Sequence, residues 1–455
     1  MKKAIYTIIL LVTFGLSNLA NAQTLAGGRA FSLAVCDNYT VQAWGYNTNG
    51  QLGNGTNTDS NVPVAVSFLT GITSVSCGDR HSLALKNDGT GWAWGDNSNG
   101  AFGNGTNTNS NVPVVVSSVT DITVIAAGRY HSLALKNDST VWAWGFNGEG
   151  ALGNGTYTNS NVAVPVSYLT GVVAISAGTN FSLALKIDGS VWAWGINDEG
   201  ELGNGSNIKS NVPVPVSFLT NIISISCGYF HSLALKNDNT VWAWGYNDNG
   251  QLGNGTYTNS NVPMVVSSLT GITALAGGRF HSLAIKDDAM VWAWGRNNSG
   301  QLGDGTNTNS NVPVQVSSLT GTTTIAAGEQ HSLARNSNGS AWTWGSNGNG
   351  ELGIGTNTNS NVPVQVNVLC SVLSLNEITE QRYLSIFPNP AFSSITIDSP
   401  IKGSLSILTS SGQQFQEQKI TEPTTTIDIS TLPSGIYFVR LRGERSVQVG
   451  KFVKQ

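Results

Sequence analysis

The dipeptide Trp-Gly recurs along the chain at a constant spacing of fifty residues. Its copies begin at Trp44, Trp94, Trp144, Trp194, Trp244, Trp294 and Trp344. A second Trp stands two positions earlier in every copy except the first, where Gln42 replaces it, and these two registers hold all 13 tryptophans. A repeat of this length that never slips predicts an array of stacked supersecondary units rather than one ordinary domain.

Each repeat has the pattern of four short strands, which we name A to D. In one copy, alternating apolar residues at 222–227, 231–236 and 240–245 predict strands A, B and C. A long Gly/Asn-rich loop follows, and residues 262–266 predict strand D, where Pro263 indicates an outer edge. A four-stranded unit cannot bury both of its faces alone. We therefore expect an all-β fold, a seven-bladed β-propeller over residues 23–375 with Trp rings between the blades.

The first 22 residues have the pattern of a signal peptide. Lys2 and Lys3 precede an apolar stretch over residues 5–16, and a small-x-small sequence ends at Ala22. We expect cleavage there, and Gln23 in place of a Cys argues against a lipid anchor. The apolar stretch is short for a membrane span and no later stretch is longer, so we expect no transmembrane segment.

The fifty-residue period ends at Cys370. Residues 376–383 are expected to be a linker, and residues 384–455 a different β module. About seven alternating stretches, including 394–397, 404–408, 425–429 and 436–441, predict a small immunoglobulin-like β-sandwich.

The repeat sequence resembles the RCC1 (regulator of chromosome condensation) family over about residues 24–370. The matching segments are Gly-x-x-His-Ser-Leu-Ala-Leu, Val-Trp-Ala-Trp-Gly and Gly-Gln-Leu-Gly-Asn-Gly. The resemblance implies the propeller fold but not the function. The best-known member is a nucleotide-exchange factor for a small nuclear GTPase on chromatin; other relatives are photoreceptors or secreted inhibitors of β-lactamases. An exported chain would not meet the nuclear partner, so we do not expect nucleotide exchange.

Three segments of the tail resemble the type A C-terminal sorting domain of the type IX (Por) secretion system of Bacteroidetes. They contain Pro388, Asn389 and Pro390; then Gly435 and Tyr437; then the terminal Lys451 and Lys454. The resemblance implies export through the periplasm, recognition by the secretion machinery and a secreted or cell-surface protein. An ordinary immunoglobulin-like binding module is the alternative, because that sandwich serves many functions.

Charge and cysteine content narrow the function classes further. The formal net charge is −4 and charged residues make up 11% of the chain. Past the N-terminus no Lys/Arg cluster occurs, so we expect no nucleic-acid partner. The four cysteines form no CxxC pair, which argues against a zinc ribbon or a thioredoxin-like site.

Ring closure is expected to involve both ends of the repeat array. The first copy has a poor strand A, and residues 372–375 fall in the strand A register. We expect that stretch to pair with strand B of the first copy, at residues 31–36, bringing Cys370 beside Cys36 in a disulfide. Cys77 and Cys227 should stay free.

The polar repeats do not form a recognisable catalytic or metal site. All five histidines share one register, in which Phe31 and Phe181 occupy the other two copies. One His per blade does not bring several ligands to one ion, and Phe in the same register indicates packing. The Asp96 loop lacks the carboxylates of a calcium site, and we attribute the loop Asn and Gly residues to positive φ.

Catalytic pairs are equally weak in this sequence. The Ser after each His should point to the opposite face of its strand, so the two cannot cooperate. Glu199 and Glu201 have no special environment visible in the sequence. We expect no catalytic residues, no metal and no cofactor.

The A–B turns and C–D loops should share one face, because alternate connections of a meander emerge on the same side. That face varies in chemistry from copy to copy and is rich in Arg, Tyr and Phe, which dominate interface hot spots. Neutral drift of exposed turns is the alternative. The candidate binding residues are Arg29, Tyr46, Arg80, Asp96, Arg129, Tyr130, Phe146, Tyr229, Phe230, Tyr246, Arg279, Phe280, Arg296 and Glu329.

The sequence therefore predicts a monomeric, exported or cell-surface binding protein whose propeller face recognises an extracellular protein or glycan. A secreted hydrolase or a protein inhibitor built on the same propeller is the alternative. The uninterrupted period argues against the hydrolase, because no blade has an inserted loop of His, Asp or Glu residues.

Overall fold

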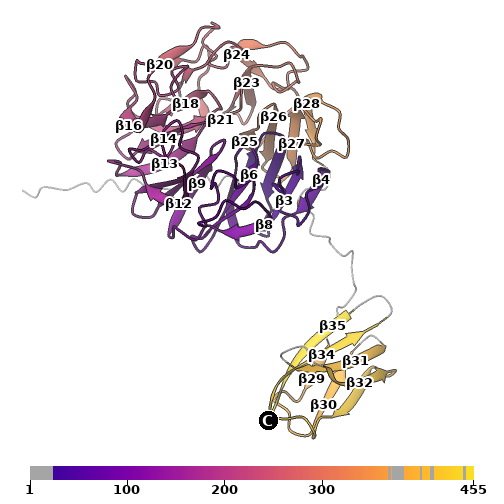
Figure 1. Cartoon of the computed structure of the whole chain (residues 1–455). Coiled ribbons are helices and arrows are strands. Elements are labelled where there is room, and N and C mark those ends of the chain that lie inside the picture. The colour runs from indigo at the N-terminus through magenta and orange to yellow at the C-terminus, as the bar shows by residue number, and fades with distance from the viewer. Residues whose placement is uncertain (1–23, 367–369, 371–383, 400–401, 410–413, 444–446) are drawn as a thin grey trace, which may run out of the picture. The chain divides into compact units, whose positions relative to one another are not determined.

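A computed structural model describes residues 24–366, 370, 384–399, 402–409, 414–443 and 447–455 (Figure 1). The predicted signal peptide and the linker at 376–383 lie outside the described residues. The described chain folds into β-strands and divides into two compact units, Met1–Cys370 and Ser371–Gln455. Within it, no helix is long and apolar enough to span a bilayer.

The first unit is a ring of seven antiparallel four-stranded sheets, one for each repeat, numbered here as blades 1 to 7 (Figure 1). The A strands are β1 (Leu25–Gly27), β5 (Ile72–Cys77), β9 (Ile122–Ala127), β13 (Val172–Ala177), β17 (Ile222–Cys227), β21 (Ile272–Gly277) and β25 (Thr322–Ala327). The B strands are β2 (Phe31–Val35), β6 (His81–Lys86), β10 (His131–Lys136), β14 (Phe181–Lys186), β18 (His231–Lys236), β22 (His281–Lys286) and β26 (His331–Asn336).

The C strands are β3 (Val41–Gly45), β7 (Gly91–Gly95), β11 (Val141–Gly145), β15 (Val191–Gly195), β19 (Val241–Gly245), β23 (Val291–Gly295) and β27 (Ala341–Gly345). The D strands are β4 (Ser60–Ala65), β8 (Ser110–Val115), β12 (Ser160–Pro165), β16 (Ser210–Pro215), β20 (Ser260–Val265), β24 (Ser310–Gln315) and β28 (Ser360–Gln365). The A strands contact one another around the axis, and the D strands form the outer edge.

One arrangement joins each blade to the next. The ring of Trp144 is fully buried, and its Nε1 donates to the carbonyl of Ala101 in the preceding blade at 2.8 Å. Ser132 Oγ donates to the same carbonyl at 2.9 Å. Equivalent Trp and Ser residues make this pair of bonds at all seven interfaces, including the one between blades 7 and 1. Burial of each indole contributes about 3 kcal/mol and the bonds satisfy its N–H.

The expected strand exchange between the chain ends is wrong. Leu25 of β1 pairs with Ala34 of β2, so β1 itself fills the inner edge of blade 1. Strand β2 is then paired on both sides, by β1 and by β3, and has no free edge for residues 372–375. Those residues lie outside the described part of the chain. Even a three-residue strand suffices here because the blade interface, rather than strand exchange, closes the ring.

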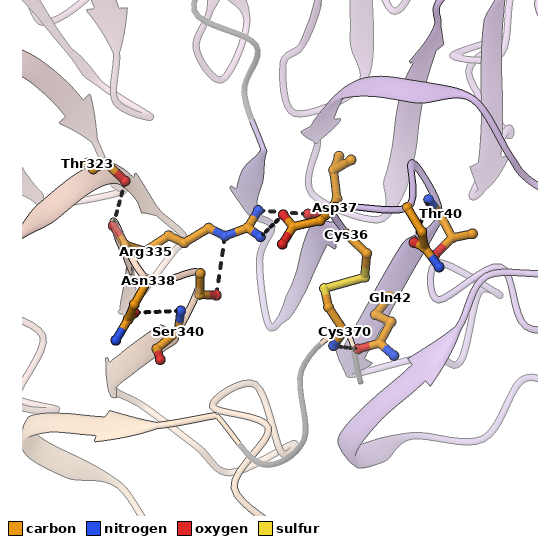
Figure 2. Close-up of polar contacts among 12 residues, drawn as sticks. Cys36, Asp37, Thr40, Gln42, Thr323, Arg335, Asn338, Ser340 and Cys370 are labelled. Atoms are coloured by element: carbon orange, nitrogen blue, oxygen red, sulfur yellow. Dashed lines mark hydrogen bonds and ion pairs between the residues drawn. A yellow bond between two sulfur atoms is a disulfide. The ribbon is translucent and has the colours of Figure 1, made fainter. Parts of the chain in front are cut away.

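Blades 7 and 1 are also joined by a set of residues that break the repeat, which we call the seam (Figure 2). Cys36 at the end of β2 and Cys370 form a disulfide with Cα atoms 5.2 Å apart. The Cys370 amide donates to the side-chain carbonyl of Gln42 at 2.9 Å. Arg335 of blade 7 donates to the carbonyl of Val35 at 2.9 Å and to the Asp37 carboxylate at 2.6 Å.

The long C–D loops are organised by a buried Asn in each blade. Asn47 is fully buried; its amide group donates to the carbonyls of Thr56 and Thr58, and its oxygen accepts from the Leu52 amide. The interpretation that these Asn residues serve positive φ is therefore wrong. Glycines such as Gly50 do have positive φ, but Asn221 and Asn239, both outside the C–D loops, are the described asparagines that do.

The second unit is a β-sandwich of two sheets. One contains β29 (Ser385–Phe387), β30 (Ser394–Asp398) and β33 (Thr424–Asp428). The other contains β31 (Gly403–Thr409), β32 (Gln414–Ile420), β34 (Gly435–Arg442) and β35 (Val447–Lys454). Inward residues from both sheets, such as Ile395, Ile397, Ile407 and Val439, are buried in one core.

Candidate functional site

The A–B turns and C–D loops lie on the same face of the propeller, which we call the A–B face. In blade 5 the amide of Tyr246, which starts the C–D loop, donates to the carbonyl of Phe230 in the A–B turn at 2.9 Å. The equivalent bond occurs in all seven blades. On the opposite face, the B–C turns bond to the D–A connections, as where the Asn87 amide donates to the Gly71 carbonyl at 2.8 Å.

At the axis, the first variable residue of each A–B turn contributes to a ring of seven residues. This axial ring consists of Arg29, Asp79, Arg129, Thr179, Tyr229, Arg279 and Glu329. Main-chain bonds connect neighbouring turns, for example from the Asp79 amide to the Arg129 carbonyl at 3.2 Å. The residue before each member of the axial ring is a glycine, because the A–B turn passes close to the first side chain of strand B. A Cβ on Gly78, for example, would lie 2.3 Å from the imidazole of His81.

Asp79 lies beneath three guanidinium groups. Its carboxylate is 3.8–3.9 Å from Arg29, Arg80 and Arg129. The Asp79 side chain is 3% exposed, whereas the three arginine side chains are 37–44% exposed. Burial raises the pKa of Asp79 despite the positive charges of Arg129 and Arg29.

Glu329 occupies the same kind of position on the other side of Arg29. Its carboxylate is 3.2 Å from Arg29 and also pairs with Arg279. The Glu329 side chain is 6% exposed and that of Arg279 35%. The two buried carboxylates thus hold guanidinium groups whose outer sides reach solvent.

Several buried polar atoms of this region have no hydrogen-bond partner among the described residues. They are Asp79 Oδ2, the Tyr229 hydroxyl, Arg80 Nε and Arg279 Nε. Burial and the nearby charges of Asp79 and Glu329 raise the pKa of Tyr229 well above its ordinary value. The phenol therefore stays protonated and is a hydrogen-bond donor.

An aromatic triad flanks the axial ring over blades 5 and 6. Phe230 and Phe280 stack with ring centroids 5.7 Å apart, and Tyr246 lies 6.2 Å and 5.7 Å from them. The guanidinium groups of Arg279 and Arg296 lie 4.8 Å and 5.6 Å from the Phe280 ring. Five predicted residues thus form one half-exposed cluster.

A second cluster lies over blades 2 and 3. Tyr130 contacts Phe146 edge to face at 6.4 Å, and the Arg129 guanidinium lies 4.7 Å from the Tyr130 ring. A small cleft beside it is lined by Arg80 and Asp96 together with Arg129 and Tyr130. Tyr46 of blade 1 is half-buried in its loop and belongs to neither of these clusters.

Large aromatic side chains are not confined to the A–B face. Phe68, Tyr168 and Phe218 lie in D–A connections on the opposite face and are 97%, 93% and 85% exposed. These side chains stand singly, with no ring contact among the described residues, whereas those of the A–B face form clusters with Arg. What distinguishes the A–B face is this clustering, not the number of aromatics.

Sequence reasoning missed a contact of the histidines. His131 Nε2 lies 3.0 Å from Ser182 Oγ of the next blade, and four other histidines make the same contact. Ser182 in turn donates to the Ala151 carbonyl. Burial lowers the pKa of His131 to about 3, so its ring is neutral. Because the Ser proton is held by a main-chain carbonyl, the pair joins blades rather than activating a nucleophile.

The glutamates that sequence analysis set aside differ from each other. Glu201 is 1% exposed, and burial raises its pKa to about 7. One of its oxygens accepts from the Glu199 amide at 3.0 Å. The carboxylate of Glu199 instead bonds to Asn259 at 2.5 Å. Among the described residues, no three His, Cys, Asp or Glu side chains are placed to hold a metal ion.

The three tail segments singled out by the sequence meet in the sandwich. Asn389 donates to the Lys451 carbonyl at 3.0 Å and accepts from the Val453 amide at 2.9 Å. Gly435 pairs with Lys454 in the sheet. The Tyr437 ring stacks on Phe452 at 5.6 Å, and its hydroxyl donates to the Pro433 carbonyl at 2.9 Å.

Family models match both units. Residues 40–85 and 88–135 match the regulator of chromosome condensation (RCC1) repeat, and residues 158–382 match the RCC1-like domain. Residues 385–455 match the secretion system C-terminal sorting domain. The chain is an RCC1-like propeller with a C-terminal sorting domain. The sorting domain indicates type IX secretion, an export system of Bacteroidetes. This RCC1-like protein is therefore secreted or displayed on the cell surface.

Solved structures agree with the fold of the RCC1-like propeller. Yeast RCC1 (Prp20), solved bound to Kap60, is 23% identical with a TM-score of 0.68, covering 80% of this chain and 91% of its own. Human WBSCR16 is 24% identical with a TM-score of 0.66, covering 72% and 93%. Yeast Prp20p, described together with its binding properties to Gsp1p and histones, is 25% identical with a TM-score of 0.65, covering 76% of this chain and 86% of its own. None of the curated proteins compared with this chain matches it in sequence.

Proposed function

We propose that this protein is an exported recognition protein and that the A–B face of its propeller binds an extracellular protein or glycan. The observation behind this proposal is the grouping of half-exposed Arg and aromatic side chains around the axial ring. Such groups supply large contact area and directed hydrogen bonds, which is why they dominate binding hot spots. The similar Prp20p, described by its binding to Gsp1p and histones, supports a recognition role for this scaffold.

The hydrolase alternative lacks support among the described residues, because the His–Ser pairs serve the blade interfaces. We further propose that the protein acts as a monomer without a nucleic-acid partner.

The test compares two double variants of the full chain in capture from extracellular material of the source cells' environment. One replaces Phe230 and Phe280 of the triad with Ala, and the matched control replaces Phe68 and Phe218 of the opposite face. We expect the first to weaken capture of the same component by tenfold or more, since hot-spot losses cost about 1–3 kcal/mol each. The control should bind normally. Loss of capture only in the variant of the opposite face would overturn the proposal.

A further inference from the structure

We propose that the axial ring is an oxyanion site for an acidic saccharide, whose carboxylate pairs with the guanidinium groups of Arg29, Arg129 and Arg279. This rests on the proposed function and names the ligand class of the same face. The argument starts from charge. Four arginines, counting Arg80, surround two carboxylates, so the cluster has a formal charge of +2.

The charges are separated by depth. The side chains of Asp79 and Glu329 are 3% and 6% exposed, whereas the side chains of the four arginines are 35–44% exposed. The buried acids therefore fix the arginines, and the solvent side of the cluster is cationic. Guanidinium groups recognise carboxylates through paired, charge-assisted hydrogen bonds, and prior orientation reduces the entropy lost on binding.

The Tyr229 hydroxyl and Arg279 Nε, both buried, have no acceptor among the described residues. Asp79 Oδ2 makes no hydrogen bond but lies 3.8–3.9 Å from three guanidinium groups, so it needs no further donor. The site therefore calls for acceptors, which carboxylate and sugar oxygens both supply.

The surroundings favour a saccharide over a nucleic acid. The aromatic triad lies beside the ring, since the Tyr229 ring contacts Phe230 at 6.4 Å and Arg279 lies over Phe280. Such rings offer apolar faces to the C–H side of a sugar. The whole chain has a net charge of −4, which gives no long-range attraction for nucleic acid.

Calorimetric titration of the full chain tests this with four probes: trigalacturonate, its methyl ester, inorganic phosphate and a Glu-rich peptide. Trigalacturonate should bind, and the ester, which keeps the sugar but loses the charge, should bind at least tenfold more weakly. Arg29→Gln should weaken trigalacturonate binding about tenfold to a hundredfold. Tyr229→Phe, which keeps the ring, should weaken it about fivefold. The opposite-face control Lys286→Gln should change nothing.

Each outcome of these titrations either supports or overturns the proposal. Absence of trigalacturonate binding, or binding that survives Arg29→Gln in a variant with unchanged thermal unfolding, overturns the proposal. Equal affinity for phosphate or for the peptide overturns the saccharide class. If trigalacturonate does not bind while capture still depends on Phe230 and Phe280, the A–B face remains the recognition face and only the proposed ligand class is wrong.

Discussion

The indole Nε1 of Trp44 donates to the main-chain carbonyl of Glu351 at 2.8 Å, although these residues are 307 positions apart in the sequence. This bond is the same one that joins every other pair of neighbouring blades. The first and last blades are therefore joined by an ordinary blade interface. The disulfide and Arg335 add further contacts between them at the seam.

Trp44→Phe tests that equivalence. Removing the indole N–H while keeping most of the ring should lower the free energy of unfolding by about 1–2 kcal/mol. Trp194→Phe, at an interface inside the repeat array, is the matched variant, because Trp194 makes the same 2.8 Å bond to Ala151. Denaturant unfolding should give similar losses. A negligible loss for Trp44→Phe beside a clear one for Trp194→Phe would show that the ring is not closed in this way.

The disulfide between Cys36 and Cys370 should be a large contributor to stability. It closes a loop with a sequence separation of 334 residues, so replacing both cysteines with Ser should lower the free energy of unfolding by about 5 kcal/mol, as measured with denaturant. Alkylation of the unfolded, unreduced chain should label Cys77 and Cys227 alone. Labelling of four cysteines in the secreted protein would contradict the seam.

Acid should destabilise the propeller through its buried histidines. The pKa of His131 falls from 6.5 to about 3 on burial, so below pH 6.5 the unfolded chain takes up a proton that the folded chain excludes. The contribution of His131 to the free energy of unfolding is complete above pH 6.5 and is lost as the pH falls toward 3. At pH 5 the loss is about 2 kcal/mol.

His131→Phe introduces the residue that blades 1 and 4 have at this position. It should remove the part of the acid-induced loss of stability that His131 causes. Denaturant unfolding at pH 8 and pH 5 measures it, and comparison with the parent chain cancels the other groups. One of these is Glu201, whose pKa is raised to about 7, so its contribution has the opposite sign and is lost as pH rises from 4.5 through 7. An unchanged difference between the two pH values in His131→Phe would contradict a neutral, buried His131.

The sorting domain should be needed for export but not for folding of the propeller. A chain truncated after Glu377 keeps all seven blades and the Cys370 disulfide. It should fold, with the unfolding midpoint of the propeller unchanged, and stay in the periplasm. Normal amounts of this truncated chain in the medium would argue against the sorting role of the tail.

The repeat made the blades predictable, because strand and turn patterns recur in register and each unit needs neighbours to bury it. The axial ring was only partly predictable. Five members of the ring were candidates through their variation: Arg29, Arg129, Tyr229, Arg279 and Glu329. Thr179 and Asp79, in the same register, were not. The importance of Asp79 comes from its burial, and burial of a turn residue depends on how the blades converge on the axis.

Breaks in the repeat were a stronger signal than the sequence analysis used. Arg335 stands where the other blades have Val, Leu or Ile, and it is the residue that reaches Val35 and Asp37 across the seam. Cys36 and Gln42 also break their registers and meet Cys370 there. The contact between His131 and Ser182 could not be read from one repeat, because its partners belong to different blades.

Hydrogen–deuterium exchange of the full chain, free and with the component it captures, tests the recognition face most directly. Binding should protect the A–B turns and C–D loops, above all peptides that cover residues 228–231, 246–250 and 278–281. Peptides that cover the B–C turns and D–A connections, such as residues 66–72 and 236–240, should exchange as before. Protection confined to the latter peptides would contradict the account.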